Sequence, residues 1–291
     1  MGYLLAVAAT VFWAGNFVLA RGLHERIPPV SLAFWRWAVA VVALAPFAMR
    51  GLSEDRRIVH RYLPYLSVTA LIGVTVFNTL IYVAGHTTQA INLSLIATSS
   101  PIFIILLARV FYREPITPSR AAGALIALSG VLVLITGGDL GKILGLTFAA
   151  GDVWMLGAAV AFAAYSVLVK RKPAGLGTSS FLLVTFVLGL LLLTPVYVWE
   201  RLSHSPVHWD RATILSVLYV GVFASVVAFF LWNQAIGLIG PSRAALVYYL
   251  VPVFSGIAAY VFLGESIRAV HVLSLGLIMG GIAVANRERV R

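Results

Sequence analysis

Long apolar segments recur along almost the whole chain and are separated by short polar breaks. Ten of these segments are long enough to cross a bilayer, since a transmembrane helix needs about 20 apolar residues. The predicted spans are residues 3–20, 30–49, 62–85, 90–111, 118–136, 152–169, 179–198, 212–236, 241–263 and 269–286. This pattern predicts an all-α polytopic membrane protein whose short loops leave no room for a separate soluble domain.

The second half of the chain repeats the pattern of the first half. Between Tyr82 and Val133 the two copies align without a gap, at a constant separation of 151 positions; the identical pairs include Ala84/Ala235, Leu95/Leu246, Pro101/Pro252, Phe111/Phe262, Glu114/Glu265 and Gly130/Gly281. Each copy holds five spans, and because five is odd the second copy enters the membrane from the opposite side. We therefore predict two inverted five-helix repeats (5+5), residues 1–138 and 139–291.

Composition supports a membrane location and narrows the chemistry. Apolar residues make up 61% of the 291 residues and charged residues only 11%, against about 25% charged in soluble domains. Cysteine is absent, which excludes disulfides, thiolate metal sites and a cysteine nucleophile. The net charge of +11 lies in the breaks between spans, where it would face lipid headgroups, so we expect the lipid bilayer and no nucleic acid as a partner.

The distribution of Lys and Arg predicts the orientation. Of the 21 basic residues, 14 fall in the tail and loops on the amino-terminal side of the membrane and 6 in the loops on the other side. Because cytoplasmic loops carry the excess of positive charge, both termini are predicted to be cytoplasmic.

Several motifs resemble those of a known family. Trp13-Ala14-Gly15-Asn16-Phe17, Tyr112-Arg113-Glu114-Pro115 and Leu263-Gly264-Glu265-Ser266 resemble the EamA-type members of the drug/metabolite transporter superfamily, and most of all the aromatic amino-acid exporters of the YddG kind. The resemblance covers nearly the whole chain. It implies a multi-pass secondary carrier of a bacterial inner membrane that exports amino acids and related metabolites. Small multidrug antiporters of this superfamily use a carboxylate in their first span. This chain has Ala14-Gly15-Asn16 in that region and no such acid, which counts against drug/proton antiport by the same mechanism.

Polar and aromatic side chains within the spans are the candidate substrate-binding residues, because polar groups persist in a bilayer core at a cost. Several share a helix face, at spacings of three or four residues. The candidates are Trp13, Asn16, Asn78, Tyr82, His86, Ser94, Thr98, Trp154, Tyr165, Asn233, Tyr248 and Tyr249. Their rings, amides and hydroxyls suit an aromatic or bulky apolar side chain. Backbone opened near Pro101 and Pro252 would meet the charged ends of an amino acid.

Each candidate also has a purely structural interpretation. Trp13 and Trp154 could be interfacial anchors, and the three Asn residues could be interhelical hydrogen-bond partners. His86 lies near a span end and is expected to be a loop residue. Tyr248 and Tyr249 are adjacent, so at most one of them is expected to face a cavity.

Three charged residues at or near the spans need separate interpretations. We expect Glu114 and Glu265 to be structural, each satisfying free backbone N–H groups at the start of the following helix. Arg36 is expected to extend outward from the second span to the headgroups. Its alternatives are attraction of a substrate carboxylate or an ion pair with Asp152.

The leading functional prediction is export of amino acids, aromatic or large neutral ones, by alternating access around a midplane cavity. The alternative is export of other metabolites or of cationic drugs such as methyl viologen. A membrane-embedded enzyme is the distant alternative, and the sequence contains no HExxH, no GxSxG and no paired intramembrane Asp. We expect no cofactor and no metal, and a protein that functions as a monomer because one chain holds both repeats.

Overall fold

The structure, a computed structural model, describes residues 1–23, 26–88, 93, 96–139, 141–145, 149–203, 207–263 and 269–287. Within these residues all of the regular secondary structure is helical. The elements are α1 (Gly2–Leu23), α2 (Pro29–Arg61), α3 (Leu63–Ala70), the π-helix η1 (Leu71–Val76), α4 (Phe77–Thr87), α6 (Ser100–Tyr112), α7 (Pro118–Thr136), α8 (Gly141–Leu144), α9 (Ala150–Lys170), α10 (Thr178–Ser203), α11 (Arg211–Gly221), the π-helix η2 (Val222–Val227), α12 (Ala228–Ile239), α13 (Pro241–Tyr248), α14 (Val251–Leu263) and α15 (Ala269–Ala285).

The helices confirm the predicted all-α membrane fold, with two corrections to the spans. Among the described residues, six helical rods are long and apolar enough to cross a membrane, two of them formed by α3–η1–α4 and α11–η2–α12. The second span was predicted to end at residue 49. In the structure α2 continues to Arg61 and includes the polar segment after Gly51, which was expected to be a loop. The ninth span is two helices, α13 and α14, interrupted at Tyr249 and Leu250.

The internal repeat extends to irregularities of the backbone. The π-helices η1 and η2 begin at Leu71 and Val222, which are separated by the same 151 positions as the sequence repeat. Helices α6 and α14 have the same separation at both ends, and α7 and α15 at their starts. A π-turn is a rare local irregularity, so its recurrence at equivalent positions indicates a shared structural role. The boundary between residues 138 and 139 stays a prediction.

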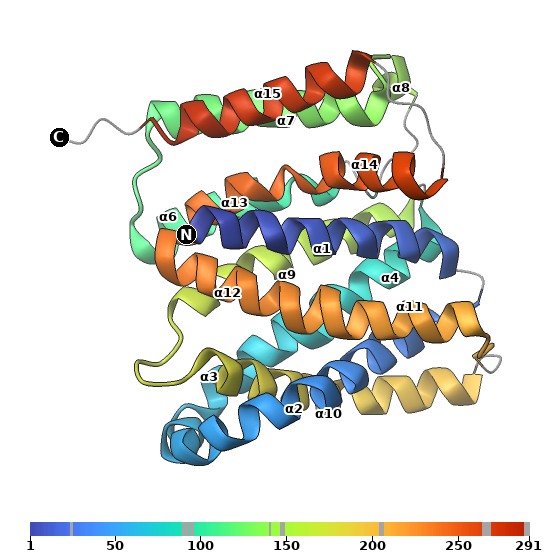
Figure 1. Cartoon of the computed structure of the whole chain (residues 1–291), viewed down its shortest axis with the longest axis vertical. Coiled ribbons are helices and arrows are strands. Elements are labelled where there is room, and N and C mark those ends of the chain that lie inside the picture. The colour runs from blue at the N-terminus through green and yellow to red at the C-terminus, as the bar shows by residue number, and fades with distance from the viewer. Residues whose placement is uncertain are drawn as a thin grey trace.

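The two repeats interlock, since helices pack on their counterparts from the other half (Figure 1). At one end of the long axis α7 lies along α15, and at the other end α2 lies along α10. Between these pairs α4 packs on α9 and α1 on α12. The α7–α15 contact brings the two backbones together: a Cβ added to Gly123 would lie 2.4 Å from the carbonyl oxygen of Gly281.

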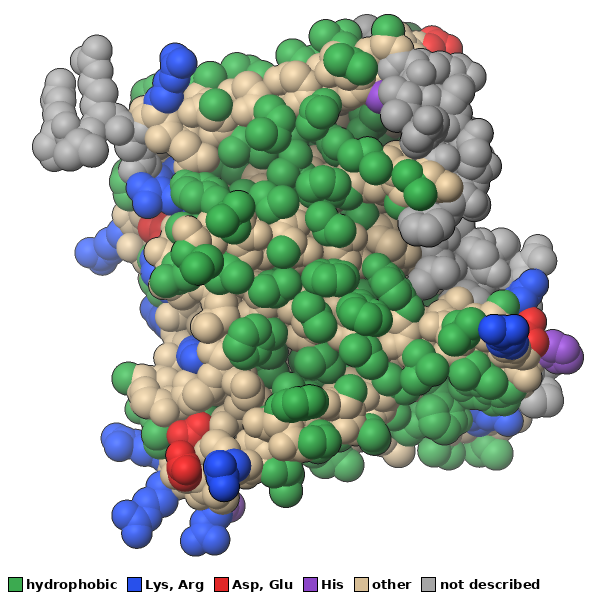
Figure 2. All heavy atoms as spheres, viewed as in Figure 1, with side chains coloured by type: hydrophobic (Ala, Val, Ile, Leu, Met, Phe, Trp, Pro, Cys, Tyr) green, Lys and Arg blue, Asp and Glu red, His purple; other side chains and the backbone are tan. Residues whose placement is uncertain are grey.

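Figure 2 shows a broad belt of apolar side chains across the visible face. Lys and Arg gather mostly along its left side, where the N-terminus lies in Figure 1, and we call this side the basic end of the molecule. The last described helix ends on this same side, because the Tyr3 hydroxyl donates a hydrogen bond to Asn286 Oδ1. Large apolar side chains are also strongly exposed, such as Phe47 at 80% and Val110 at 71%, as expected for a surface that faces lipid. The predicted orientation, with this basic end in the cytoplasm, stays a prediction.

Candidate functional site

Aromatic rings from both repeats meet around Trp13 of α1. Its ring lies 5.4 Å from Phe162 of α9, 5.2 Å from Trp232 and 5.9 Å from Phe229 of α12, and 5.9 Å from Tyr248 of α13, measured between centroids. Phe77 of α4 stacks on Phe162, and we call these six rings the central aromatic cluster. Trp13 is only 6% exposed, so it is no interfacial anchor. Ring pairs in edge-to-face and tilted arrangements stabilise the fold by more than the burial of their apolar surface alone.

A buried cation lies beside this cluster. Arg36 of α2 is 1% exposed, and its guanidinium donates three hydrogen bonds. The acceptors are Ser225 Oγ at 2.6 Å, Tyr82 Oη at 2.9 Å and the Ala224 carbonyl at 3.0 Å. The Tyr82 hydroxyl in turn lies 3.5 Å from Asn16 Oδ1, a long contact. We call Arg36, Tyr82, Asn16, Ser225 and the Ala224 carbonyl the Arg36 cluster.

The outward extension predicted for Arg36 is therefore wrong. The reason is that acceptors are present inside the bundle, where the sequence alone indicates only apolar surroundings. Ala224 and Ser225 belong to η2, and the irregular hydrogen bonding of a π-turn makes backbone carbonyls available to side chains. The Ala224 carbonyl also accepts a hydrogen bond from Trp13 Nε1 at 3.0 Å. A single carbonyl thus joins the Arg36 cluster to the central aromatic cluster.

A second polar pair occupies the equivalent place in the other half. Asn233, which corresponds to Tyr82 in the repeat, donates from Nδ2 to Tyr165 Oη at 2.9 Å and to the Phe229 carbonyl at 2.7 Å. Its Oδ1 atom is buried and has no hydrogen-bond partner among the described residues. Tyr165 in turn packs on η1, since a Cβ added to Gly73 would lie 2.1 Å from its ring. An unpaired buried acceptor of this kind is uncommon and is available to a ligand.

Helices are interrupted at matching positions beside the two prolines. Thr98 and Ser99 form a turn before α6, and Tyr249 and Leu250 form the equivalent turn before α14. The Tyr249 hydroxyl is buried and has no partner among the described residues. The interruptions agree with the opened backbone expected near Pro101 and Pro252. That this opened backbone contacts the charged ends of a substrate stays a prediction.

The remaining candidates are placed as follows. Asn78 is buried and donates to the Gly73 carbonyl of η1 at 3.4 Å, so it stays within its own span. Trp154 is 47% exposed on the outside of α9, and His86 is exposed near the end of α4. Both adjacent tyrosines, Tyr248 and Tyr249, are buried, and Tyr248 belongs to the central aromatic cluster. Ser94 and Glu265 lie outside the described residues.

Sequence reasoning missed several residues of this centre. Phe162, Phe229 and Trp232 are not distinguished from lipid-facing residues by their apolar character. Two of their repeat partners gave no signal either, since Phe162 corresponds to Val11 and Trp232 to Ile81, whereas Phe229 corresponds to the candidate Asn78. Ser225 Oγ donates a hydrogen bond of 2.9 Å to the carbonyl of Val220, five residues earlier. This spacing of five residues fits a π-turn and not an α-turn.

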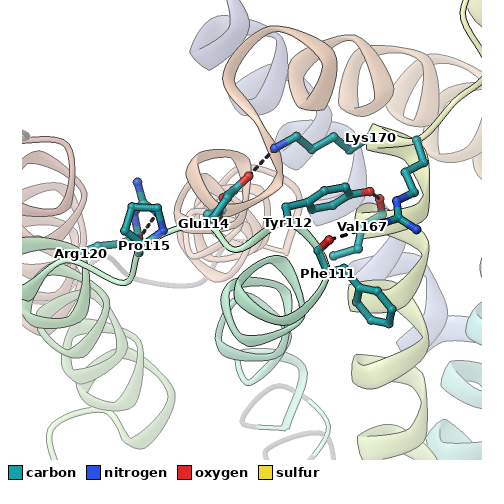
Figure 3. A network of polar contacts seen from close by, with 9 residues as sticks. Phe111, Tyr112, Glu114, Pro115, Arg120, Val167 and Lys170 are labelled. Atoms are coloured by element: carbon teal, nitrogen blue, oxygen red, sulfur yellow. Dashed lines mark hydrogen bonds and ion pairs between the residues drawn. The ribbon is translucent and has the colours of Figure 1, made fainter.

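Glu114 joins three elements at the basic end of the molecule (Figure 3). Its carboxylate accepts hydrogen bonds from Lys170 Nζ at the end of α9 and from Ser242 Oγ at the start of α13. We call these three residues the inner-end link. Burial alone would raise the pKa of the Glu114 carboxyl, but the hydrogen bonds from Lys170 and Ser242 and nearby positive charge outweigh it, so the pKa is lowered.

The capping role expected for Glu114 on the next helix belongs to another residue. Thr117 is the N-cap of α7, and its side chain accepts from the Arg120 backbone N–H at 3.2 Å. Glu114 sits three residues earlier and is directed toward α9 and α13 by the turn at Arg113, which has a φ of 55°. A short hydroxyl next to the helix suits the N-cap geometry better than a distant carboxylate.

Acidic side chains hold helix ends on the opposite side of the molecule. Glu200 of α10 is 4% exposed and accepts from the backbone N–H groups of Val30 and Ser31, at 2.9 and 2.6 Å, at the start of α2. We call Glu200, Val30 and Ser31 the outer-end link. Asp210 caps α11 and forms an ion pair with Arg26 at 2.7 Å. Carboxylates at helix N-termini satisfy free N–H groups and favour the helix dipole.

Comparison with known proteins agrees with this architecture. The EamA-like transporter family matches residues 1–136 and again residues 149–287. Among similar proteins, a transporter of unassigned function from Bacillus subtilis, YyaM, is 28% identical over 98% of this chain and 93% of its own length. A probable terminal-alkyne amino-acid exporter from Streptantibioticus cattleyicolor is 28% identical over 97% and 92%. A probable amino-acid metabolite efflux pump from Salmonella typhimurium is 27% identical over 96% and 93%.

A solved crystal structure has the same fold. It superposes with a TM-score of 0.77 and covers 98% of this chain and 96% of its own, at 22% sequence identity. With two family matches that together span nearly all of the sequence, the chain belongs to the EamA-like transporter family.

Proposed function

We propose that this protein is a secondary carrier that exports aromatic or large neutral amino acids across a bacterial inner membrane by alternating access. The observation that carries the proposal is the central aromatic cluster, to which both repeats contribute. It is joined to the Arg36 cluster through the Ala224 carbonyl. Such a site offers ring faces to an apolar side chain and fixed polar groups to its charged end.

The symmetry of the repeats supports alternating access. Two halves of similar sequence and opposite orientation can exchange conformations, which gives inward-open and outward-open states of similar energy. The inner-end link and the outer-end link each join one repeat to the other, at opposite ends of the bundle. In this mechanism the two links open in turn, while the centre between them holds the substrate.

Export of cationic drugs is the weaker alternative. A buried guanidinium beside the central aromatic cluster repels a cationic ligand, because like charges at low dielectric are strongly unfavourable. Two of the relatives are also named for amino-acid compounds. Family and relatives alike are transporters, which favours transport over enzymatic chemistry.

Flux measured in proteoliposomes tests the proposal. Labelled phenylalanine, threonine and methyl viologen would each be supplied with and without an imposed pH gradient. We expect saturable phenylalanine flux that equilibrates and does not concentrate the substrate. A Trp13→Ala variant should lose most of this flux, whereas Trp199→Ala, at a residue 64% exposed on α10, should keep it. Flux equal to that of empty liposomes, or uphill flux driven by the pH gradient, would contradict the proposal.

A further inference from the structure

Arg36 is a buried charge whose hydrogen bonds all go to neutral oxygens, and its guanidinium carbon also lies 5.2 Å from the centroid of the Trp37 ring. Its partners are a serine hydroxyl, a tyrosine hydroxyl and a backbone carbonyl, and no carboxylate forms an ion pair with it among the described residues. It lies seven residues after the start of α2, about 10 Å along the helix. An arginine within an apolar membrane-spanning helix opposes membrane insertion. Intramembrane charges of this kind commonly serve a substrate.

The guanidinium also has donors to spare. It carries five N–H groups, of which Nε, Nη1 and Nη2 each use one in the contacts above. One N–H therefore remains on each terminal nitrogen, without an acceptor among the described residues. Two N–H groups on adjacent nitrogens match the two oxygens of a carboxylate, which is the geometry that arginine binds best.

The surroundings of Arg36 identify the rest of the ligand. Its Nη2 atom and Trp13 Nε1 donate to the same carbonyl oxygen, each at 3.0 Å. An anion on the guanidinium would therefore lie next to the central aromatic cluster. A small inorganic anion would leave those rings unused, whereas an aromatic carboxylate would contact both features.

Among the described residues, no carboxylate faces the two central clusters in the way that Arg36 does, so none is placed to bind an ammonium ion there. The buried carboxylates Glu200 and Asp152 hold the first turns of α2 and α9, and Glu114 belongs to the inner-end link. Within the part of the chain that the structure describes, no carboxylate hydrogen-bonds to a member of either central cluster. An amino group would thus find neutral oxygens only, and its charge would face that of Arg36.

We propose that Arg36 is the carboxylate-binding and specificity-determining residue of the site, and that the amino group of the substrate is dispensable. This inference rests on the proposed function. It extends the substrate class from aromatic amino acids to aromatic monocarboxylates without an amino group, such as 3-arylpropionates and aryl 2-hydroxy acids. Aromatic amines without a carboxylate are excluded from the site.

Competition in proteoliposomes tests the inference. Flux of labelled phenylalanine would be measured against excess unlabelled 3-phenylpropionate, phenethylamine or acetate. We expect 3-phenylpropionate to inhibit about as strongly as phenylalanine, and phenethylamine and acetate at least about tenfold less, as loss of a charged hydrogen-bond pair implies. Arg36→Gln should weaken inhibition by 3-phenylpropionate about tenfold or more, and Arg36→Lys by less. Arg109→Gln, an exposed arginine of α6, is the control and should leave inhibition unchanged.

Calorimetric titration of the purified protein with 3-phenylpropionate separates this inference from the proposed function. Binding that Arg36→Gln removes and Arg36→Lys partly keeps would support the carboxylate site even if liposomes show no phenylalanine flux. Inhibition by phenethylamine as strong as that by phenylalanine would overturn it. So would inhibition by acetate equal to that by 3-phenylpropionate, or unchanged binding of 3-phenylpropionate in a folded Arg36→Gln variant.

Discussion

At the scale of single residues, one backbone oxygen connects the two halves of the candidate site. The Ala224 carbonyl accepts a hydrogen bond from both Trp13 and Arg36, so a substitution of either side chain should alter the interactions of the other. Its position in a π-turn explains why it is open to side chains. Residues that share a partner in this way are expected to be energetically coupled.

Trp13 should therefore respond to the size of its replacement. Trp13→Ala leaves a void where four rings now make contact, and we expect the free energy of unfolding to fall by about 3–5 kcal/mol. Trp13→Phe keeps most ring contacts and loses one hydrogen bond, so about 1–2 kcal/mol is expected. Denaturation in mild detergent would measure both. Equal effects of the two variants would contradict the packing role.

Glu114 should make stability depend on pH. Its folded pKa is lowered from the ordinary 4.5, so the inner-end link stabilises the protein above that value and loses this contribution as pH falls through the folded pKa. Because Lys170 is partly exposed, we expect about 1 kcal/mol or less. Unfolding midpoints of the native protein and of Glu114→Gln should differ at neutral pH and converge in acid. A difference that grows as pH falls would contradict this sign.

At the scale of elements, the α7–α15 contact depends on glycine. A Cβ on Gly281 would lie 2.5 Å from the Ala127 backbone nitrogen and 2.5 Å from the Gly123 carbonyl oxygen. Gly281→Ala should therefore separate the helices and lower the free energy of unfolding by about 1–3 kcal/mol. The matched control is the adjacent Gly280, which has no atom within 4 Å of an added Cβ.

Gly280→Ala should leave stability unchanged or raise it slightly, because alanine favours helix more than glycine does. Thermal unfolding of the two purified variants, side by side, gives the comparison. Equal destabilisation by both substitutions would show that the close α7–α15 contact is absent in the membrane protein.

Element boundaries were predictable where apolar length decides them, and less so elsewhere. The fifth span was predicted at residues 118–136, and α7 occupies these residues. The continuation of α2 to Arg61 was missed because the polar segment beyond Gly51 was interpreted as a loop. The break at Tyr249 was signalled by Pro252, since proline disfavours a continuous helix before it.

The location of the candidate site was harder to predict, since sequence gives depth in the membrane but not direction. Arg36 and Trp154 show the limit: the arginine points into the bundle and the tryptophan is exposed on its surface, whereas Phe162, on the same helix as Trp154, lies at the centre. Which face of a helix turns inward depends on helices far apart in sequence. The repeat predicted two similar halves, but not that α2 packs on α10 and α7 on α15.

At the scale of the whole molecule, the absence of cysteine allows the orientation to be tested directly. Arg287 is exposed after α15 and Arg211 is exposed at the start of α11, and the end of α15 and the start of α11 lie on opposite sides of the molecule in Figure 1. A single cysteine at position 211 should react with an impermeant maleimide in intact cells, and one at position 287 only after permeabilisation. The reverse pattern would contradict cytoplasmic termini.

The central claim, that one buried site is exposed to the two sides in turn, is tested most directly by counterflow. Proteoliposomes loaded with unlabelled phenylalanine would be diluted into a trace of labelled phenylalanine. An alternating carrier predicts that label transiently accumulates above its external concentration, because each return of the site carries substrate. Trp13→Ala should abolish this overshoot. Uptake of label that is indifferent to internal phenylalanine would indicate a channel-like pore and contradict the account.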